Sequence, residues 1–133
     1  MAKVAIVDDD ALSVLRLGDI LTESGHTVLT VCANAQSKIT GSLVPHLNLI
    51  SSNLEEIRQR ILGFEPDFVL LDHSLELPFS GEDVANVLGI ESTKLVGTSN
   101  VFDQKYCSLK FRGDKKKPRE NERKCLQEII GGA

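Results

Sequence analysis

The amino-acid sequence predicts an α/β fold, a doubly wound five-stranded parallel sheet with helices on both faces. Short apolar runs rich in Val, Ile and Leu alternate with segments of helical periodicity along the 133 residues. Such runs are typical of parallel strands that helices cover on both faces. Because alternating strands and helices form βαβ units with right-handed crossovers, we expect the flavodoxin-like strand order 2-1-3-4-5. The length fits a single domain over residues 1–133.

Each predicted element has its own sequence signal. Strands are expected at the densest apolar runs, residues 4–7, 27–32, 68–71, 94–97 and 106–111. About five helices are expected, the four clearest at residues 11–24, 54–62, 82–88 and 118–130, where apolar residues recur at helical spacing. Gly25 is suited to end the first helix, and Pro118 suits the first turn of the last. The helix after Asn100 is expected to be short or degenerate.

Residues 33–53 do not fit this alternation. They contain Gly41, Pro45 and several Ser and Asn residues, with an apolar patch from Leu43 to Ile50. Glycine, proline and clustered small polar residues are typical of loops. We interpret the segment as an irregular connection with at most a turn of helix.

Composition excludes several classes of protein. Hydrophobic residues make up 41% of the chain and charged residues 26%, which is typical of a globular domain. No apolar run is long enough to span a membrane and no secretory signal is present, so we expect a cytoplasmic location. Cys32, Cys107 and Cys125 lack the spacing of a zinc site and are expected to be reduced.

Charge is distributed unevenly along the chain. Residues 110–133 carry eight basic and four acidic residues, although the whole chain has a net charge of −4. Basic residues could meet phosphate groups, but the chain lacks the overall basic balance and the stacking aromatics of a nucleic-acid module. We therefore interpret residues 110–124 as a solvated surface and do not expect direct nucleic-acid binding.

Polar residues follow four of the predicted strands. Asp8 to Asp10 follow the first strand, Asp72 the third and Thr98 the fourth, and Lys110 lies near the end of the fifth. Ligands of open α/β sheets bind outside the carboxyl ends of the strands, so these side chains are expected to converge. Clustered carboxylates repel one another, and Mg²⁺ relieves this repulsion and prefers oxygen ligands. One carboxylate could then be the nucleophile of a phosphoryl transfer.

Each of these residues also has an ordinary structural explanation. An aspartate after the first strand could cap the following helix and favour its dipole, although three exceed that need. Asp72 could be a solvated loop residue, Thr98 a turn residue and Lys110 a surface lysine. The functional interpretation rests on their combination, in order, at matching strand ends.

Four segments resemble receiver domains of response regulators, which belong to two-component signalling. They are VAIVDDD at 4–10, SGHTV at 24–28, PDFVLLD at 66–72 and LVGTS at 95–99. The resemblance covers most of the chain and weakens after residue 100. It implies a stand-alone receiver domain, divergent in its C-terminal third, that changes its surface when it is phosphorylated.

The resemblance also implies roles for individual residues. Asp72 would accept the phosphoryl group. Asp8, Asp9, Asp72 and the backbone carbonyl of Ser74 would hold Mg²⁺, with Asp9 as a direct ligand and Asp8 acting through water. Thr98 would bond a phosphoryl oxygen and shift on phosphorylation.

The lysine of the site is left open between two residues. The family lysine normally ends the fifth strand and precedes a proline. Lys110 ends a credible strand but precedes Phe111, whereas Lys117 precedes Pro118 but follows residues that cannot form a buried strand. We favour Lys110, because strand burial constrains the choice more than one proline does. Tyr106 is then a candidate for the switch aromatic of this strand.

The same resemblance implies partners. A sensor histidine kinase or a phosphotransfer protein would supply the phosphoryl group, and an unidentified protein partner or a homodimer would respond to it. The domain would not be an enzyme, beyond self-phosphorylation from a phosphodonor and slow autodephosphorylation.

Some residues depart from the family pattern. The connection over residues 33–53 is much longer than is usual in receivers, and we interpret it as an insertion. Pro78 lies six residues after Asp72, where receivers usually have a proline four residues after the acceptor. This altered loop leaves a second hypothesis open, a pseudo-receiver that acts as an interaction module without phosphorylation. His73 adjoins the acceptor, where it could tune access, although a packing role is simpler. An aspartyl-phosphate hydrolase of the haloacid-dehalogenase kind is disfavoured, because Ser74 stands where its second aspartate would be.

Overall fold

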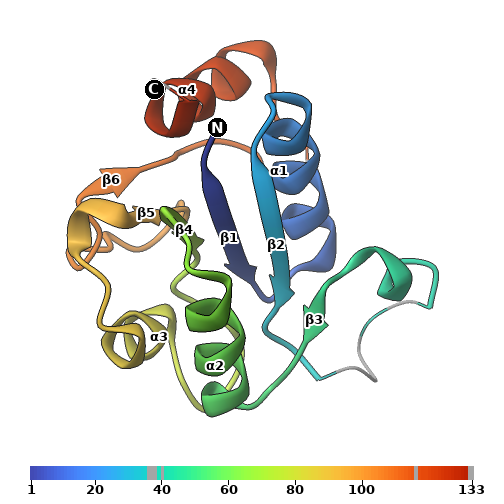
Figure 1. Cartoon of the computed structure of the whole chain (residues 1–133), viewed down its shortest axis with the longest axis vertical. Helices are drawn as coiled ribbons and strands as arrows, with labels where there is room; N and C mark the ends of the chain where they lie inside the picture. Colours follow the sequence, from blue (N-terminus) through green and yellow to red (C-terminus); the bar gives the residue numbers. More distant parts are fainter. Residues whose placement is uncertain (36–38, 40, 116, 132–133) are drawn as a thin grey trace.

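The computed structural model describes residues 1–35, 39, 41–115 and 117–131, and these form three layers (Figure 1). The middle layer is a parallel six-stranded sheet in the order β3-β2-β1-β4-β5-β6. Its strands are β1 (Lys3–Asp8), β2 (Thr27–Cys32), β3 (Leu49–Ile50), β4 (Phe68–Leu71), β5 (Leu95–Gly97) and β6 (Leu109–Lys110). The predicted fold class is therefore confirmed, while the predicted count of five strands is wrong by one.

The additional strand, β3, comes from the predicted insertion. Leu49 and Ile50 lie beside Val31 and Cys32 at the edge of β2. The Asn48 carboxamide oxygen fixes this pairing by accepting hydrogen bonds from the Thr30 amide (2.9 Å) and the Thr30 hydroxyl (3.0 Å). The predicted turn of helix is the 3₁₀ segment η2 (Val44–His46). Residues 36–38 and 40 of the insertion lie outside the described residues.

Helices cover both faces of the sheet, as the alternating sequence pattern predicts. They are α1 (Ala11–Glu23), α2 (Leu54–Phe64), α3 (Gly81–Leu88) and α4 (Glu120–Gly131), with a 3₁₀ turn, η3 (Ser92–Lys94), before β5. Buried residues of α2 and α3 join one apolar cluster with one face of the sheet. Buried residues of α1 and α4 join a second cluster on the other face. Residues 98–108, all described, form no helix, in line with the expected degenerate helix.

The sheet is buried because both of its faces are covered. In β1, every residue after Lys3 is buried, as are the last four residues of β2 and the last three of β4. This explains why the strands have nearly continuous apolar sequences instead of alternating ones. Consequently, polar side chains directly after these strands emerge at one edge of the sheet.

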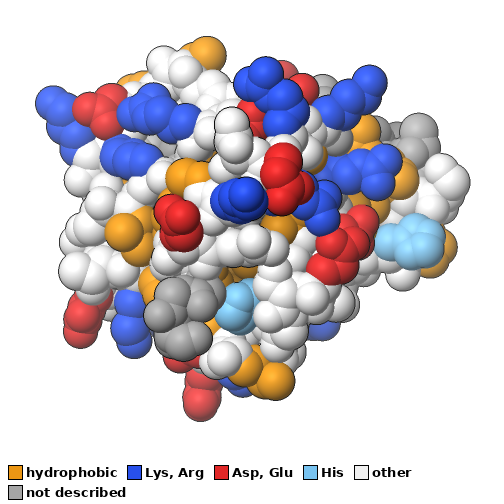
Figure 2. Space-filling view, turned by 90° about the horizontal axis from the view of Figure 1, so that it is seen from above, with side chains coloured by type: hydrophobic (Ala, Val, Ile, Leu, Met, Phe, Trp, Pro, Cys, Tyr) orange, Lys and Arg blue, Asp and Glu red, His pale blue; other side chains and the backbone are white. Residues whose placement is uncertain are grey.

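The surface over α4 carries charges of both signs. Figure 2, which views Figure 1 from above, shows Lys and Arg side chains interspersed with Asp and Glu. Arg123 contacts Glu23 at 2.7 Å, and Arg119 contacts Glu122 at 3.1 Å. The predicted solvated surface for residues 110–124 holds for exposed residues such as Arg119, but Phe111 and Glu122 are buried and the Lys115 side chain is 14% exposed. Among the described residues, no helix combines the length and apolar character that crossing a bilayer requires.

Candidate functional site

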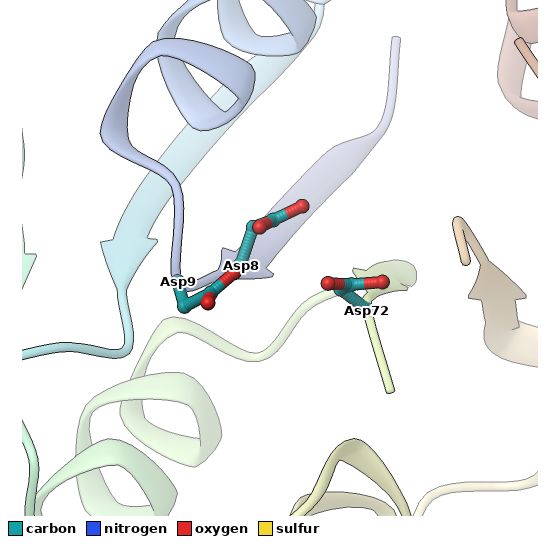
Figure 3. Close-up of side chains that lie close together, drawn as sticks. All are labelled: Asp8, Asp9 and Asp72. Carbon is teal, nitrogen blue, oxygen red and sulfur yellow. The ribbon is translucent and has the colours of Figure 1, made fainter. Parts of the chain in front are cut away.

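Three predicted site carboxylates come together at the carboxyl edge of the sheet. Ligand oxygens of Asp8, Asp9 and Asp72 lie within 4.8 Å of one another, and Figure 3 shows the three carboxylates facing a common space. The pairing of Val7 with Leu71 explains this, because it ends β1 and β4 at the same level. Asp72 follows β4 directly, so it lies beside Asp8 at the end of β1.

The three aspartates at the end of β1 make different contacts. The Asp10 amide donates to Asp8 Oδ1 (3.0 Å), which orients the first carboxylate. Asn34 Nδ2 donates to the Asp9 carbonyl at 3.0 Å and holds the loop. Asp10 is the residue before α1, and its carboxylate accepts from the Ser13 hydroxyl at 2.6 Å. Asp10 thus occupies the N-cap position of α1 and contacts Ser13 without a side-chain capping hydrogen bond to the helix backbone, whereas Asp8 and Asp9 lie close to Asp72.

Burial makes the negative charges of this cluster costly. Asp8 is 2% exposed and Asp72 is 8% exposed. Burial and the neighbouring Asp8 raise the pKa of Asp9 to about 7. Burial and Asp8 also raise the pKa of Asp72, which a nearby lysine partly opposes. Such a cluster favours the arrival of a cation.

That lysine is Lys115, which is not one of the two lysines predicted from the sequence. Its Nζ atom lies 2.6 Å from Asp8 Oδ2 and 3.4 Å from Asp72 Oδ1, and the side chain is 14% exposed. Burial alone would lower the pKa of Lys115, but Asp8 and Asp72 outweigh it and raise the pKa. Lys115 is therefore a charged partner of both carboxylates.

The structure brings Lys115 to the carboxylates instead of the predicted Lys110. Lys110 does lie on the last strand, opposite Gly97, but its ammonium contacts Asp103 Oδ1 at 3.0 Å and the Gln104 carbonyl. Lys117 is exposed. The predicted strand at 106–111 is observed only at Leu109–Lys110, and the chain continues past Phe111 before Lys115 reaches the carboxylates.

A turn anchored by distant residues carries Lys115 to the site. Gly113 has φ +151°, and a Cβ there would lie 2.6 Å from the Glu122 side chain. Asn100 Nδ2 donates to the Gly113 carbonyl at 2.8 Å, and the Asp114 amide donates to Glu122 Oε2 at 3.0 Å. The sequence signal for this lysine is the run of lysines before Pro118, but Gly113 makes a buried strand there unfavourable.

Thr98 lies beside the acceptor, as predicted. It is 1% exposed, and its amide donates to the carbonyl of Leu71, the residue before Asp72, at 3.1 Å. Its role towards a phosphoryl oxygen stays a prediction. The same holds for the carbonyl of Ser74, which lies in the exposed loop after Asp72.

Gly81 is a second site residue that the sequence analysis did not single out for this purpose. A Cβ at this position would lie 2.0 Å from the Asp72 carbonyl oxygen. The Gly81 amide donates to the His73 carbonyl at 2.8 Å, so the first turn of α3 abuts the acceptor. Any side chain there would push the helix and Asp72 apart.

The donor set fits a hard divalent cation. Three carboxylates within reach of one ion supply the oxygen ligands that Mg²⁺ prefers. Burial and, after it, the neighbouring carboxylates raise the pKa of Asp9, and a bound cation would favour its charged form. A bound Mg²⁺ would be held by Asp8, Asp9 and Asp72.

Comparison with solved structures gives the fold a family setting. The signal receiver domain of a modulated diguanylate cyclase from Desulfovibrio desulfuricans superposes with a TM-score of 0.65 at 19% identity, covering 100% of this chain and 93% of that one. The response regulator domain of Thermotoga maritima CheB gives 0.58 at 13% identity, covering 96% and 89%. The N-terminal domain of a response regulator receiver protein from Methanoculleus marisnigri gives 0.57 at 13% identity, covering 97% and 94%.

These structures show that the chain has the fold of response-regulator receiver domains. No protein-family model and no curated protein sequence matches it.

Proposed function

We propose that this chain is a phosphoacceptor receiver domain, which takes a phosphoryl group on Asp72 in a Mg²⁺-dependent reaction and acts as a signalling switch. One observation carries the proposal. The buried Asp72 lies between two further carboxylates and the ammonium of Lys115, at the sheet edge where ligands of α/β folds bind. The family resemblance and the receiver fold support the same role.

The geometry suits nucleophilic attack by a carboxylate. Asp72 attacks the phosphorus of a donor, forms an acyl phosphate, and the donor's leaving group departs with the bonding electrons. Lys115 Nζ, 3.4 Å from Asp72 Oδ1, places a positive charge where the incoming phosphoryl oxygens gather. Thr98 supplies a hydroxyl from the neighbouring strand end. When bound, Mg²⁺ would neutralise the remaining negative charge of the carboxylates and the phosphoryl group.

Phosphorylation would act as a local electrostatic switch. It adds negative charge and strong acceptor oxygens next to Thr98 and Lys115. Thr98 is followed by the exposed residues 100–103, and Lys115 follows the exposed Asp114, so movement of either residue would change the adjacent surface. We propose a histidine kinase or phosphotransfer protein as donor and a protein partner as the reader. The intact carboxylates argue against a role as an unphosphorylated interaction module.

The proposal is tested by intact-protein mass spectrometry after incubation with Mg²⁺ and acetyl phosphate. The expected result is a mass gain of one phosphoryl group in the wild-type protein, which Asp72→Asn or chelation of Mg²⁺ abolishes. Asp67→Asn is the matched control, because Asp67 precedes β4 at the opposite edge of the sheet. A gain that survives Asp72→Asn, or no gain in folded protein with Mg²⁺ present, would contradict the proposal.

A further inference from the structure

A buried glutamine links both strand ends of the site. Gln104 is 1% exposed. Its Oε1 atom accepts from the Ser99 amide at 2.8 Å, and its Nε2 atom donates to the Leu71 carbonyl at 2.7 Å. Leu71 directly precedes Asp72 and Ser99 directly follows Thr98. One carboxamide therefore ties the acceptor strand to the threonine strand.

The same carboxamide reaches the other side of the acceptor. Gln104 Nε2 also donates to the Tyr106 hydroxyl at 2.9 Å, and that hydroxyl lies 3.0 Å from His73 Nδ1. His73 directly follows Asp72, and its ring stacks on Phe102 with centroids 3.7 Å apart and an interplanar angle of 7°. The network thus contacts residues on both sides of Asp72 and ends on the 100–105 loop.

The fold makes room for this glutamine. A Cβ at Gly97 would lie 2.8 Å from Gln104 Oε1, so the carboxamide fits only against a glycine in β5. The Gln104 carbonyl in turn accepts from the Lys110 ammonium. Buried polar groups are costly unless they are hydrogen-bonded. The side-chain oxygen and nitrogen of Gln104 both have hydrogen-bond partners.

The network ends at exposed apolar side chains. Val101 is 90% exposed and Phe102 is 44% exposed, and both stand in the loop that the network holds. A change in the conformation of this loop would therefore change the apolar surface that the protein presents to solvent. Because Gln104 holds the Ser99 amide, movement of the neighbouring Thr98 must either carry Gln104 along or break their hydrogen bond.

We infer that Gln104 is a positioning residue that couples the state of Asp72 to the 100–105 loop, so that Val101 and Phe102 respond to phosphorylation. The inference rests on the proposed function, since it presupposes that Asp72 takes a phosphoryl group. It adds the element that transmits the change and the part of the surface that reports it.

The chain has no tryptophan, so Phe102→Trp introduces a single fluorescent reporter in the loop. The protein is incubated with Mg²⁺ and acetyl phosphate, and each sample is read twice: by intact mass for the phosphorylated fraction, and by fluorescence. We expect a fluorescence change proportional to the phosphorylated fraction. With Gln104→Met in the same background, the change per phosphoryl group should be largely lost, because the hydrogen bonds from the loop to Ser99 and Leu71 are removed.

Controls separate coupling from stability. Gln59→Met removes an exposed glutamine of α2 and should leave the fluorescence change per phosphoryl group intact. Tyr106→Phe removes only the hydroxyl between Gln104 and His73 and should reduce the change, and it decides the matter if Gln104→Met does not fold. If the fluorescence change per phosphoryl group is unchanged in folded Gln104→Met, the inference is overturned and the proposed function stands. If Gln104→Met does not fold, an unchanged value in Tyr106→Phe has the same consequence. Absence of phosphoryl uptake in the Phe102→Trp and wild-type proteins overturns the proposed function and the inference with it.

Discussion

Replacing Lys115 with methionine tests which lysine serves the acidic cluster. The ammonium lies 2.6 Å from Asp8 Oδ2 and 3.4 Å from Asp72 Oδ1. At an effective dielectric constant of about 20, unit charges at these distances attract by about 6 and about 5 kcal/mol. Desolvation of the buried partners offsets much of this attraction.

The loss of folding stability caused by Lys115→Met can be bounded from the burial of its partners. Removing one partner of a buried pair typically costs about 3–5 kcal/mol, because the other charge stays buried without compensation. We take about 3 kcal/mol for Lys115→Met at pH 8 without Mg²⁺, since the carboxylates can take up a proton instead. Burial and Asp8 already raise the pKa of Asp9 to about 7. The cost should therefore shrink as the pH falls through about 7 and the cluster becomes less negative.

Urea denaturation of wild type, Lys115→Met and Lys110→Met provides the measurement. Lys110→Met is the comparison variant, because its ammonium contacts the exposed Asp103 carboxylate and the Gln104 carbonyl, and a partly exposed pair plus one hydrogen bond contributes about 1–2 kcal/mol. Adding Mg²⁺ should stabilise Lys115→Met more than the wild type, since the ion and the ammonium compensate the same carboxylates. Equal costs for the two variants, or a Mg²⁺ effect that is the same in both proteins, would refute this reasoning.

Three further predictions concern the supports of the site and the fold. Gly81→Ala should lower stability by about 1–3 kcal/mol and slow phosphoryl uptake, because the new Cβ would lie 2.0 Å from the Asp72 carbonyl oxygen. Gly63→Ala in α2, which has open space around it, should change neither stability nor uptake. Urea denaturation measures the stability of the two variants, and intact mass measures their phosphoryl uptake. His26 has a lowered pKa because it is buried and close to the positively charged N-terminus, and its Nδ1 accepts a hydrogen bond from the Ala2 amide. The stability advantage of wild type over His26→Gln should therefore shrink as the pH falls below about 6.5, because the unfolded state then binds a proton that the folded state disfavours. A stability difference that does not change with pH would contradict this. Asn48→Ala should cost about 1 kcal/mol and increase hydrogen exchange at the Thr30 amide, because it removes the acceptor that fixes β3; unchanged exchange there would argue against that role.

The sequence was most informative where local pattern and burial coincide. The apolar runs that end at Asp8 and Asp72 had to be central strands, since little else buries such segments completely. Parallel strands place their carboxyl ends at one edge, so the convergence of these aspartates and Thr98 followed from the fold class alone. The confirmed fold and the observed acidic cluster are both of this kind.

The remaining features depend on contacts between residues far apart in the chain. Lys115 reaches Asp8 only because Asn100 and Glu122 hold the turn at Gly113, and no local pattern encodes these contacts. Similarly, β3 is two residues long and rests on hydrogen bonds between Asn48 and Thr30. Such features have no periodicity, so pattern-based reasoning interpreted them as loop.

The identity of the phosphorylated residue is the most direct test of the account. Acyl phosphates are reduced by borohydride, which converts a phosphorylated aspartate into homoserine. The protein would be incubated with Mg²⁺ and acetyl phosphate, reduced, digested with trypsin and sequenced by mass spectrometry, with Asp72 read in the peptide between Arg60 and Lys94. We predict homoserine at position 72 and unmodified aspartate at positions 8 and 9. Homoserine at position 8 or 9, or none at position 72 in folded protein, would contradict the account.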